Sequence, residues 1–390
     1  MGVIVTAGIT ANALGVIRAF GRRGIPVVYL DSEPHSIVRY SRYIGERLRC
    51  PSAAESQTGF VNALLEYGRH MDREMVIVPA GDTEVLTLSK YREELQQFYR
   101  LPVPAFEIVH KLVNKRHFYR LLGEMGTPHP KTYFPDSLAE LRSIGREVPR
   151  PFIIKPAYSA PFQTAFGKKS FLVRTAHDLD RVVDQLRGKD LEVLVQEVVP
   201  GRARYAFYTY LNRESQALAV CGYDKIRHYP PALGFGCFCE SNWRRSAIDP
   251  AIELLQGIGY HGFAEPELIM DPRDGEYKLL EINARTTLQN RLAAACGVDM
   301  EYLAFLDASG SPTRDLMPSR RNVLWVDDFA DSLSFIIHLK RRDLAISEVL
   351  KSFKPGKVHS VAAWDDLAPF IVRGVGLSFR ALRLLFGRAG

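Results

Sequence analysis

Four residues of this sequence, Glu267, Glu281, Asn283 and Arg285, have types and spacing that fit the binding of a metal ion. Two carboxylates, an amide and a guanidinium are unfavourable to gather on one buried surface without a counter-ion. Mg²⁺ would supply that ion, because it prefers oxygen ligands and usually keeps contacts with the phosphates of a substrate. The set therefore predicts phosphate chemistry assisted by a divalent cation.

A β-hairpin is the element expected to bring these residues together. Segments 263–270 and 277–283 both alternate as strands do, and segment 271–275 (Asp-Pro-Arg-Asp-Gly) has the composition of a turn. Counting inward from the turn places Glu267 opposite residue 280 or 281. The carboxylates of Glu267 and Glu281 are then expected to face each other across the two strands.

Alternation along the second strand decides which side chains share a face. Glu281, Asn283 and Arg285 lie at every second position and therefore share one face, while Leu280 and Ile282 should point to the core. Apolar residues between the polar ones indicate a strand that packs on one side. The alternative is a hairpin whose polar face is simply solvated.

Two lysines lie on predicted elements of a preceding unit of the chain. Residues 114–122 predict a helix that carries Lys115, and residues 152–156 predict a strand with Lys155 at its end. A loop rich in Ser, Thr and Gln is expected over 157–169. Further elements follow as a strand at 170–174, a helix at 178–186 and a strand at 193–199. This mixed order of strands and helices is typical of an α+β arrangement.

The N-terminal part is expected to be a parallel α/β unit. Strands predicted at 3–6 and 25–30 flank a helix at 12–23, and a strand at 75–79 leads into the turn 81–84 (Gly-Asp-Thr-Glu). Ligands bind at the carboxyl edge of such sheets, so the two acids of this turn are candidate contacts, with helix capping as the alternative. No G-x-G-x-x-G fingerprint is present here, so a dinucleotide cofactor is not expected.

Composition and charge exclude several classes of protein. The 390 residues are 46% hydrophobic, with no signal peptide and no uncharged apolar stretch long enough to span a bilayer, so we expect a cytoplasmic globular protein. The five cysteines are scattered and odd in number, which is typical of reduced thiols. Of the net charge of +7, residues 331–390 contribute five, from ten basic and five acidic residues. We therefore expect no nucleic-acid partner.

The order of these motifs resembles that of the ATP-grasp superfamily over nearly the whole chain. The resemblance implies a fold class of α/β plus α+β, with ATP and Mg²⁺ as cofactors and Mn²⁺ as an alternative ion. Four parts are implied: an N-terminal parallel α/β substrate domain (1–112), an ATP-grasp lid subdomain (113–195), an ATP-grasp C-terminal subdomain with the metal site (196–315) and a small basic helical extension (316–390).

The same resemblance implies roles for individual residues. Lys115 and Lys155 are similar to the two lysines that contact the nucleotide, and Lys168 or Lys169 would act in place of a glycine-rich lid. Segment 196–199 (Gln-Glu-Val-Val) is similar to the hinge that recognises adenine, with Glu197 contacting the adenine amine. The implied nucleotide contacts are Lys115, Lys155, Lys169, Gln196, Glu197 and Val199. The implied metal ligands are Glu267, Glu281 and Asn283, with Arg285 at the phosphate or acyl phosphate.

A narrower similarity is to the branch of amino-acid ligases that includes D-aspartate ligases. It rests on segment 225–231 (Lys-Ile-Arg-His-Tyr-Pro-Pro), on segment 234–236 (Gly-Phe-Gly) and on Glu240. In that branch the first segment forms a mobile loop near the γ-phosphate, which implies that Lys225 and Arg227 hold the acyl phosphate or the substrate carboxylate. The alternative is a basic hairpin on the surface.

The function implied by this resemblance is that of an ATP-dependent carboxylate–amine ligase, which forms an acyl phosphate on an amino acid or other small carboxylate. One alternative is a carboxylating enzyme that activates bicarbonate, which would call for a biotin carrier or an amidotransferase partner. A second is a regulatory protein that binds nucleotide without chemistry. The full set of lysines and metal ligands counts against it, because a degenerate relative should have lost some of them.

The C-terminal tail has a pattern of its own. Residues 367–386 contain no acid but include Arg373, Arg380 and Arg383, which gather on one side of a helix with apolar residues on the other. Such a basic amphipathic helix can lie on an anionic membrane surface, and its arginines prevent it from spanning a bilayer. The alternative is packing on the ligase core or on a second subunit, which would make a homodimer.

Overall fold

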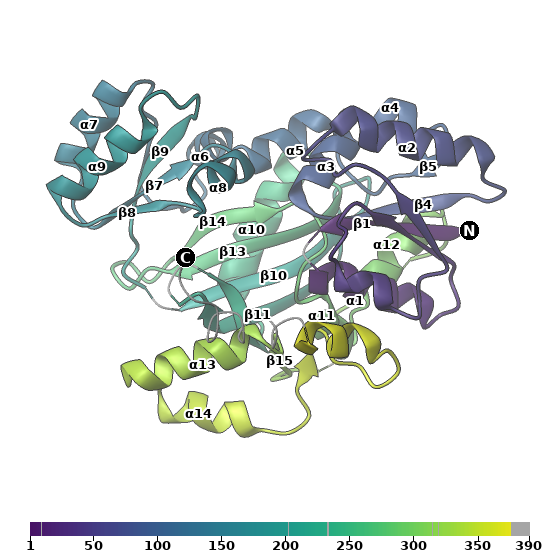
Figure 1. Ribbon diagram of the computed structural model, residues 1–390. Helices are drawn as coiled ribbons and strands as arrows, with labels where there is room; N and C mark the ends of the chain where they lie inside the picture. The colour runs from purple at the N-terminus through teal and green to yellow at the C-terminus, as the bar shows by residue number, and fades with distance from the viewer. Residues whose placement is uncertain (9, 202, 232–233, 314, 319, 376–390) are drawn as a thin grey trace, which may run out of the picture.

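The computed structural model describes residues 1–8, 10–201, 203–231, 234–313, 315–318 and 320–375. The strands of this part form three β-sheets with five, four and seven strands. Figure 1 shows the four-stranded sheet with its helices at one end of the molecule and the five-stranded sheet at the other, while the seven-stranded sheet lies between and below them. A parallel first sheet followed by mixed elements confirms the fold class of α/β plus α+β.

The five-stranded sheet is parallel throughout and has the order β3-β2-β1-β4-β5. Its strands are β1 (Gly2–Gly8), β2 (Val27–Asp31), β3 (Glu46–Arg49), β4 (Met75–Ala80) and β5 (Tyr99–Arg100), and its helices are α1 (Thr10–Gly21), α2 (Gln57–His70), α3 (Asp82–Lys90) and α4 (Arg92–Leu95). Strand β4 is apolar and buried along its whole length, as strands covered on both faces are. Helix α3 begins at Asp82, so this residue lies at the carboxyl edge of the sheet.

The four-stranded sheet has the order β6-β9-β7-β8. Its strands are β6 (Thr132–Tyr133), β7 (Phe152–Pro156), β8 (Phe171–Val173) and β9 (Val193–Glu197), with α7 (Leu138–Glu147), α8 (Ser159–Phe166) and α9 (Ala176–Leu186) around them. The loop predicted over 157–169 is wrong for most of its length, because α8 occupies it. Phe162 and Phe166, one helical turn apart, pack edge-to-face against Phe171 of β8, and this packing outweighs the loop-like composition of the segment.

The seven-stranded sheet has the order β14-β13-β10-β11-β12-β15-β16. Its strands are β10 (Arg204–Leu211), β11 (Ala217–Tyr229), β12 (Phe235–Ser241), β13 (Gly262–Met270), β14 (Tyr277–Asn283), β15 (Leu324–Val326) and β16 (Val358–His359). The mobile loop expected from Lys225 onward is wrong as far as Tyr229, because β11 continues to that residue and pairs with β12. Ladder hydrogen bonds hold this segment on both sides as far as Lys225 and on the β12 side beyond it.

Helices α5 (Phe106–Val113) and α6 (Lys115–Glu124) lead from the first sheet to the second, and α10 (Arg245–Gly257), α11 (Asn290–Ala295) and α12 (Met300–Ala308) pack around the third. Beyond them, α13 (Ala330–Arg341) and α14 (Ile346–Phe353) form a helix pair beside β11 and β12. Strands β15 and β16 lie in the extension that was expected to be helical, yet they join the third sheet. The bounds of the four expected domains stay a prediction.

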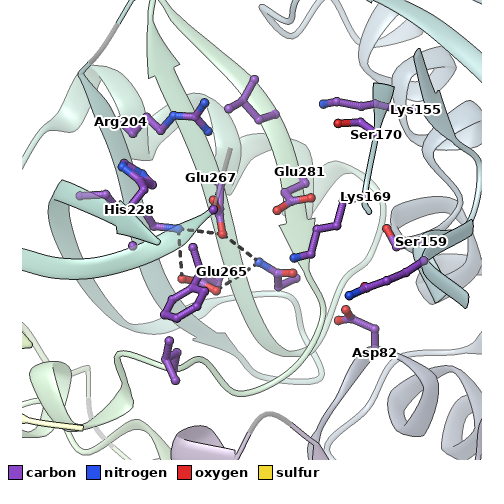
Figure 2. A pocket seen from close by; sticks show the side chains of 18 of the residues that line it. Asp82, Lys155, Ser159, Lys169, Ser170, Arg204, His228, Glu265, Glu267 and Glu281 are labelled. Carbon is purple, nitrogen blue, oxygen red and sulfur yellow. Dashed lines mark hydrogen bonds and ion pairs between the residues drawn. The ribbon is translucent and has the colours of Figure 1, made fainter. Parts of the chain in front are cut away.

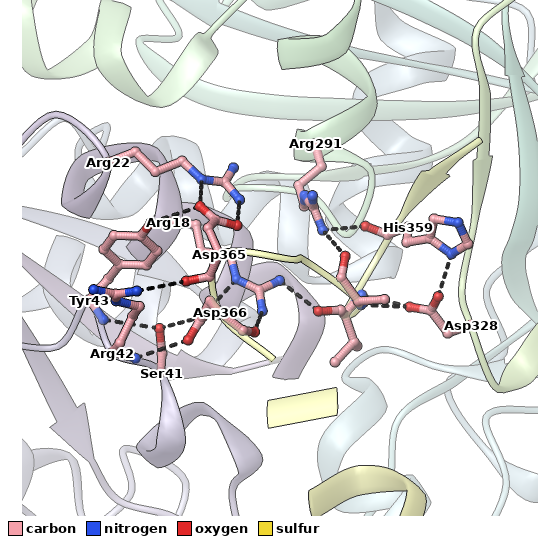
Figure 3. A network of polar contacts seen from close by, with 12 residues as sticks. Arg18, Arg22, Ser41, Arg42, Tyr43, Arg291, Asp328, His359, Asp365 and Asp366 are labelled. Atoms are coloured by element: carbon pink, nitrogen blue, oxygen red, sulfur yellow. Dashed lines mark hydrogen bonds and ion pairs between the residues drawn. The ribbon is translucent and has the colours of Figure 1, made fainter. Parts of the chain in front are cut away.

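A buried polar network ties the C-terminal segment to the first helix (Figure 3). Arg18 of α1 is fully buried, and its guanidinium donates to Asp366 Oδ2 at 2.9 Å, to the carbonyl of Asp366 at 2.9 Å and to the carbonyl of Val361 at 2.8 Å. The Asp366 carboxylate also accepts from Ser41 Oγ at 2.7 Å and from the backbone N–H of Arg42 at 3.0 Å. Segment 358–366 is therefore an integral part of the core.

The tail is described only in part. Residues 368–375 are helical, and Arg373 pairs with Asp327 at 3.3 Å, whereas Arg380, Arg383 and most of the predicted apolar face lie outside the described residues. Within the described ranges, no helix combines the length and apolar character needed to cross a bilayer.

Candidate functional site

A pocket of about 2010 Å³ lies where the three sheets meet. Its walls come from β7 and α8 of the second sheet's layer, from β11, β13 and β14 of the third sheet, and from the start of α3. Apart from Lys168, every residue to which the resemblance gives a role lines it: Lys115, Lys155, Lys169, Gln196, Glu197, Val199, Lys225, Arg227, Glu267, Glu281, Asn283 and Arg285. Of the two acids in the turn 81–84, Asp82 lines the pocket and Glu84 does not. The roles of these residues stay predictions, and their geometry decides what each could do.

The β13–β14 hairpin sets the floor of the pocket. Glu267 pairs with Glu281 in the register of the two strands, as counting from the turn predicts. A shift in register follows, since Leu268 pairs with Leu279, so Leu280 is an extra residue in a bulge. The expectation that Leu280 points to the core is wrong for this reason: it lines the pocket, and Leu279 is the buried residue.

Lys225 is the central cation of the site. Its ammonium lies 2.7 Å from Glu267 Oε1 and 3.8 Å from Glu265 Oε1, and all three side chains are largely buried (Figure 2). Burial alone would raise the pKa of Glu267, but Lys225 outweighs it and holds that pKa below its ordinary value. In turn the two glutamates raise the pKa of Lys225 against the opposing effect of burial. The lysine is therefore charged and occupies the place of a counter-ion between two carboxylates.

Glu265 is a site residue that the sequence did not single out. It pairs with Asn283 across the hairpin, accepts from Asn283 Nδ2 at 3.1 Å and from the hydroxyl of Tyr223, and is 4% exposed. Burial raises its pKa, and Lys225 opposes that shift. Its position two residues before Glu267 was the available signal, because the two must share a face of β13.

Arg285 links the hairpin to the first sheet. Its Nη2 donates to Asn283 Oδ1 at 3.2 Å, its Nη1 to the carbonyl of Thr286 at 2.9 Å, and its Nε to Asp82 Oδ1 at 2.9 Å. Asn283 Nδ2 also donates to Glu267 Oε1 at 3.3 Å. The guanidinium of Arg285 thus holds the amide of Asn283 in place from one side. Its contact with Asp82 shows that this carboxylate lies within the site, as the position of Asp82 at the sheet edge suggests.

Glu281 has different surroundings from the other glutamates. Its carboxylate makes no hydrogen bond or ion pair with any residue that the structure describes, and it faces Lys155 and Lys169 across the pocket in Figure 2. Burial lowers the pKa of Lys155 to about 8, with Lys115 adding to the effect and Glu281 opposing it. Lys115 donates to Ser159 Oγ at 2.9 Å. These lysines form a cationic wall opposite an available carboxylate.

The hinge side chains are already engaged. Glu197 accepts from the backbone N–H of Lys131 at 2.9 Å and pairs with Arg273 at 2.8 Å. Gln196 is buried and donates to Thr132 Oγ1 at 2.9 Å. The side chains therefore fix the shape of this strand end, which leaves the backbone near Val199 as the part open to a base.

Arg227 is not gathered with the other cations. Its guanidinium makes two hydrogen bonds of 2.8 Å to the carboxylate of Asp331 on α13, donates to Ser352 Oγ on α14 at 2.8 Å and lies over the ring of Phe238. Register shifts on both sides of Arg227 turn its side chain toward the helix pair. The next residue, His228, appears in the pocket view of Figure 2, and its Nε2 is buried without a hydrogen-bond partner among the described residues.

The oxygen ligands in the pocket are too few to hold a cation by themselves, and they fit a cation that is also bound to a phosphate. Among the described ranges, no group of three or more His, Cys, Asp and Glu side chains is arranged to hold a metal ion by itself. Glu267, Glu281 and the amide oxygen of Asn283 supply three oxygen donors on one hairpin, and Mg²⁺ typically completes its shell with phosphate and water. The donor set suits a hard cation that arrives with its phosphate.

Comparisons with known proteins support an ATP-using ligase fold. No protein-family model matches the chain. The D-aspartate ligase of Enterococcus faecium (strain Aus0004) is 25% identical over 295 residues, which cover 71% of this chain and 70% of that protein. The carbamoyl phosphate synthase large chain of Methanobrevibacter smithii is 22% identical over 186 residues, and the match spans only 17% of its length.

Solved structures agree on the fold. The L-amino acid ligase from Bacillus licheniformis superposes with a TM-score of 0.62 at 14% identity, covering 79% of this chain and 74% of that one. N5-carboxyaminoimidazole ribonucleotide synthetase in its ADP complex gives a TM-score of 0.65 at 14% identity, with 87% and 84% covered. The chain therefore shares its overall fold with these enzymes over most of its length.

Proposed function

We propose that this chain, an ATP-grasp ligase, uses ATP to phosphorylate a carboxylate and then joins the acyl group to an amine. The observation that carries the proposal is the convergence in one pocket of Lys225, its two glutamates, Asn283 and Arg285. Phosphoryl transfer needs little covalent chemistry from a protein, so cations and oxygen ligands placed around the reacting groups are sufficient.

ATP is proposed to lie between the four-stranded sheet and the β13–β14 hairpin. Lys115 and Lys155 face this space with point charges that suit phosphate oxygens, and Lys169 reaches it from the segment after α8. The hinge backbone near Val199 is open to the adenine. Because burial lowers the pKa of Lys155, a bound polyphosphate would stabilise the charged form of this lysine.

The cation is proposed to bind at Glu267, Glu281 and Asn283. When bound, Mg²⁺ would neutralise charge on the transferring phosphate. Glu281 is available for it, since that carboxylate has no partner among the described residues. Glu267 is held by Lys225 at 2.7 Å, and Asn283 is oriented by Arg285 at 3.2 Å.

The reaction has two displacements. A carboxylate oxygen of the substrate attacks the γ-phosphorus as its bond to ADP breaks, and the amine nitrogen then attacks the acyl carbon, loses a proton and releases phosphate. Lys225 and Arg285 are proposed to hold the anionic oxygens in both steps. Arg227 would take part only after leaving Asp331, which now binds it with two hydrogen bonds.

The proposal is tested by phosphate release from the purified full-length protein with ATP, Mg²⁺ and pools of amino acids. We expect release that requires both a carboxylate and an amine, and a product whose mass is the sum of the two substrates less water. Release that depends on bicarbonate in place of an amino acid would identify a carboxylating enzyme. Absence of release with every pool, in a protein that binds ATP, would identify a regulatory protein.

The partners proposed for this chain are a small carboxylate and a small amine, in the cytoplasm. We also propose that the C-terminal region contacts a surface outside the chain, either a membrane or a second subunit.

A further inference from the structure

The helix pair α13–α14 presents its apolar side chains to solvent. Six of the fifteen exposed large hydrophobic residues in the described part of the chain lie on these two helices. They are Leu333, Ile336, Leu339, Ile346, Leu350 and Phe353, with exposed fractions between 45% and 81%. Figure 1 places both helices at the lower edge of the molecule, away from the first two sheets. A concentration of this kind on one helix pair indicates an interaction surface.

Polar contacts fix which way each helix faces. On α14, Ser352 bonds to Arg227 and Lys351 pairs with Glu240, so that side is turned to the third sheet. On α13, Asp331 binds Arg227 and Ser334 Oγ donates to the carbonyl of His228 at 2.8 Å. Because these inward contacts anchor the helix pair, the apolar stripes of both helices face outward.

The α14 stripe has the spacing of a single helical face. Ile346, Leu350 and Phe353 are separated by four and three residues, so they lie one above another on the side opposite the polar contacts. The ring of Phe353 lies 6.3 Å from that of Phe335 on α13, which joins the two helices. The outer face of α14 is thus ready to enter an apolar medium without a change of fold.

Charge around these stripes is basic. Lys340, Arg341, Arg342 and Lys354 are exposed at the ends of the two helices. The acid nearest to them, Asp343, is bonded to His338 Nδ1 at 2.8 Å. Exposed apolar side chains rimmed by lysine and arginine are the pattern by which helices bind the interface of an anionic bilayer.

We propose that the outer face of α13–α14 docks on an anionic membrane surface. A second copy of the chain is the weaker candidate, because a symmetric dimer through this face would bring two basic rims together. The inference is independent of the ligase chemistry, since none of the six apolar residues lines the pocket. His338 and Arg341 on α13 do line it, so docking would hold that end of the pocket beside the bilayer.

Vesicle sedimentation of the full-length protein tests the proposal. We expect binding at low salt to vesicles of equal parts phosphatidylcholine and phosphatidylglycerol, and none to phosphatidylcholine alone. The triple variant Ile346→Ser, Leu350→Ser, Phe353→Ser should lower the vesicle partition coefficient by at least about tenfold, because three apolar side chains no longer enter the interface. Tyr40→Ser is the matched control, since Tyr40 is 54% exposed on another part of the surface and should leave binding unchanged.

Three results would overturn the proposal. The first is wild-type binding by the triple variant, with its ATP affinity and thermal stability unchanged. The second is loss of binding in a chain that ends at Val375, which would move the contact to the tail beyond the described residues. The third is a wild-type dimer in sedimentation velocity that the triple variant dissolves, combined with absence of vesicle binding, because the surface would then serve a second copy.

Discussion

Replacement of Asp366 by alanine should release the C-terminal segment from helix α1. The change removes the carboxylate that Arg18 Nε contacts at 2.9 Å, and both side chains are almost completely inaccessible to solvent. Removing one partner of a buried ion pair costs about 3–5 kcal/mol, because the other charge stays buried and uncompensated. Arg18 keeps its bonds to the carbonyls of residues 361 and 366, so we expect a value near the lower end, about 3 kcal/mol.

Burial already acts on this guanidinium. It lowers the pKa of Arg18, and Asp366 opposes that shift, so the carboxylate is the main group that makes the buried charge tolerable. Ser41 Oγ and the N–H of Arg42 would lose an acceptor at the same time. The effect should be local to α1 and to segment 358–366.

Hydrogen exchange measured by mass spectrometry is the suitable assay, because it reports opening segment by segment in a chain with several units. A loss of about 3 kcal/mol corresponds to exchange that is roughly 150-fold faster in α1 (Thr10–Gly21) if opening is at equilibrium. Asp365→Ala is the matched control. Asp365 pairs with Arg22 at 2.7 Å, but both side chains are about 40% exposed, so its loss should change the opening free energy by under about 1 kcal/mol.

The reasoning is refuted if Asp366→Ala and Asp365→Ala have equal effects, or if exchange in α1 is unchanged. A double variant separates the buried charge from the hydrogen bonds: Arg18→Met with Asp366→Leu removes both ions and should recover part of the lost stability, while Ser41, Arg42 and the carbonyls of residues 361 and 366 stay without their partners. Failure of that recovery, with the single variant still destabilised, would mean that the backbone contacts of Arg18 carry the effect.

Three further predictions concern the pocket. Glu281→Gln should lower ATP turnover by at least about hundredfold with an unchanged circular dichroism spectrum, because it removes a charged cation ligand and keeps the volume; turnover near the wild-type rate would contradict the assignment. Lys155, with a pKa of about 8, is an ammonium at pH 7 and largely an amine at pH 9, so the Kd for ATP measured by calorimetry should rise by up to about tenfold per pH unit above 8. The variant Lys155→Arg should remove this pH dependence of the Kd. Lys225→Met leaves two carboxylates without their cation, so the variant should have a lower thermal midpoint, and Mg²⁺ should raise that midpoint more than it does in the wild type. An equal rise of the midpoint with Mg²⁺ in both proteins would exclude competition between lysine and metal.

Local patterns predicted much of this fold. The parallel first unit and the β13–β14 hairpin follow from periods of 3.6 and 2 within short stretches, and the facing pair Glu267 and Glu281 follows from counting along that hairpin. Positions in the pocket were predictable as well, because a run of motifs in the right order resembles a known superfamily. Periodicity alone therefore reaches those residues whose neighbours in space are also neighbours along the chain, and the resemblance adds the distant residues of the pocket.

The features that the sequence did not predict are those that depend on contacts between segments far apart along the chain. The bulge at Leu280 depends on how β14 meets Leu268 and cannot be read from alternation alone. The resemblance implied a mobile loop at residues 225–229, yet partners on the hairpin and on α13 hold the charges of Lys225 and Arg227 at the sheet. The contact of Arg18 with Asp366 joins residues 348 positions apart, and no local pattern marks either of them.

That separation has a consequence for how the protein is made. Synthesis runs from the N-terminus, so α1 leaves the ribosome long before Asp366 exists. Until then the first domain holds a buried arginine whose acceptors, the carbonyl of residue 361 and both the carbonyl and the carboxylate of residue 366, have not yet been synthesised. The part of the chain around α1 should therefore remain loosely packed during synthesis, and its final closure has to follow the synthesis of segment 358–366.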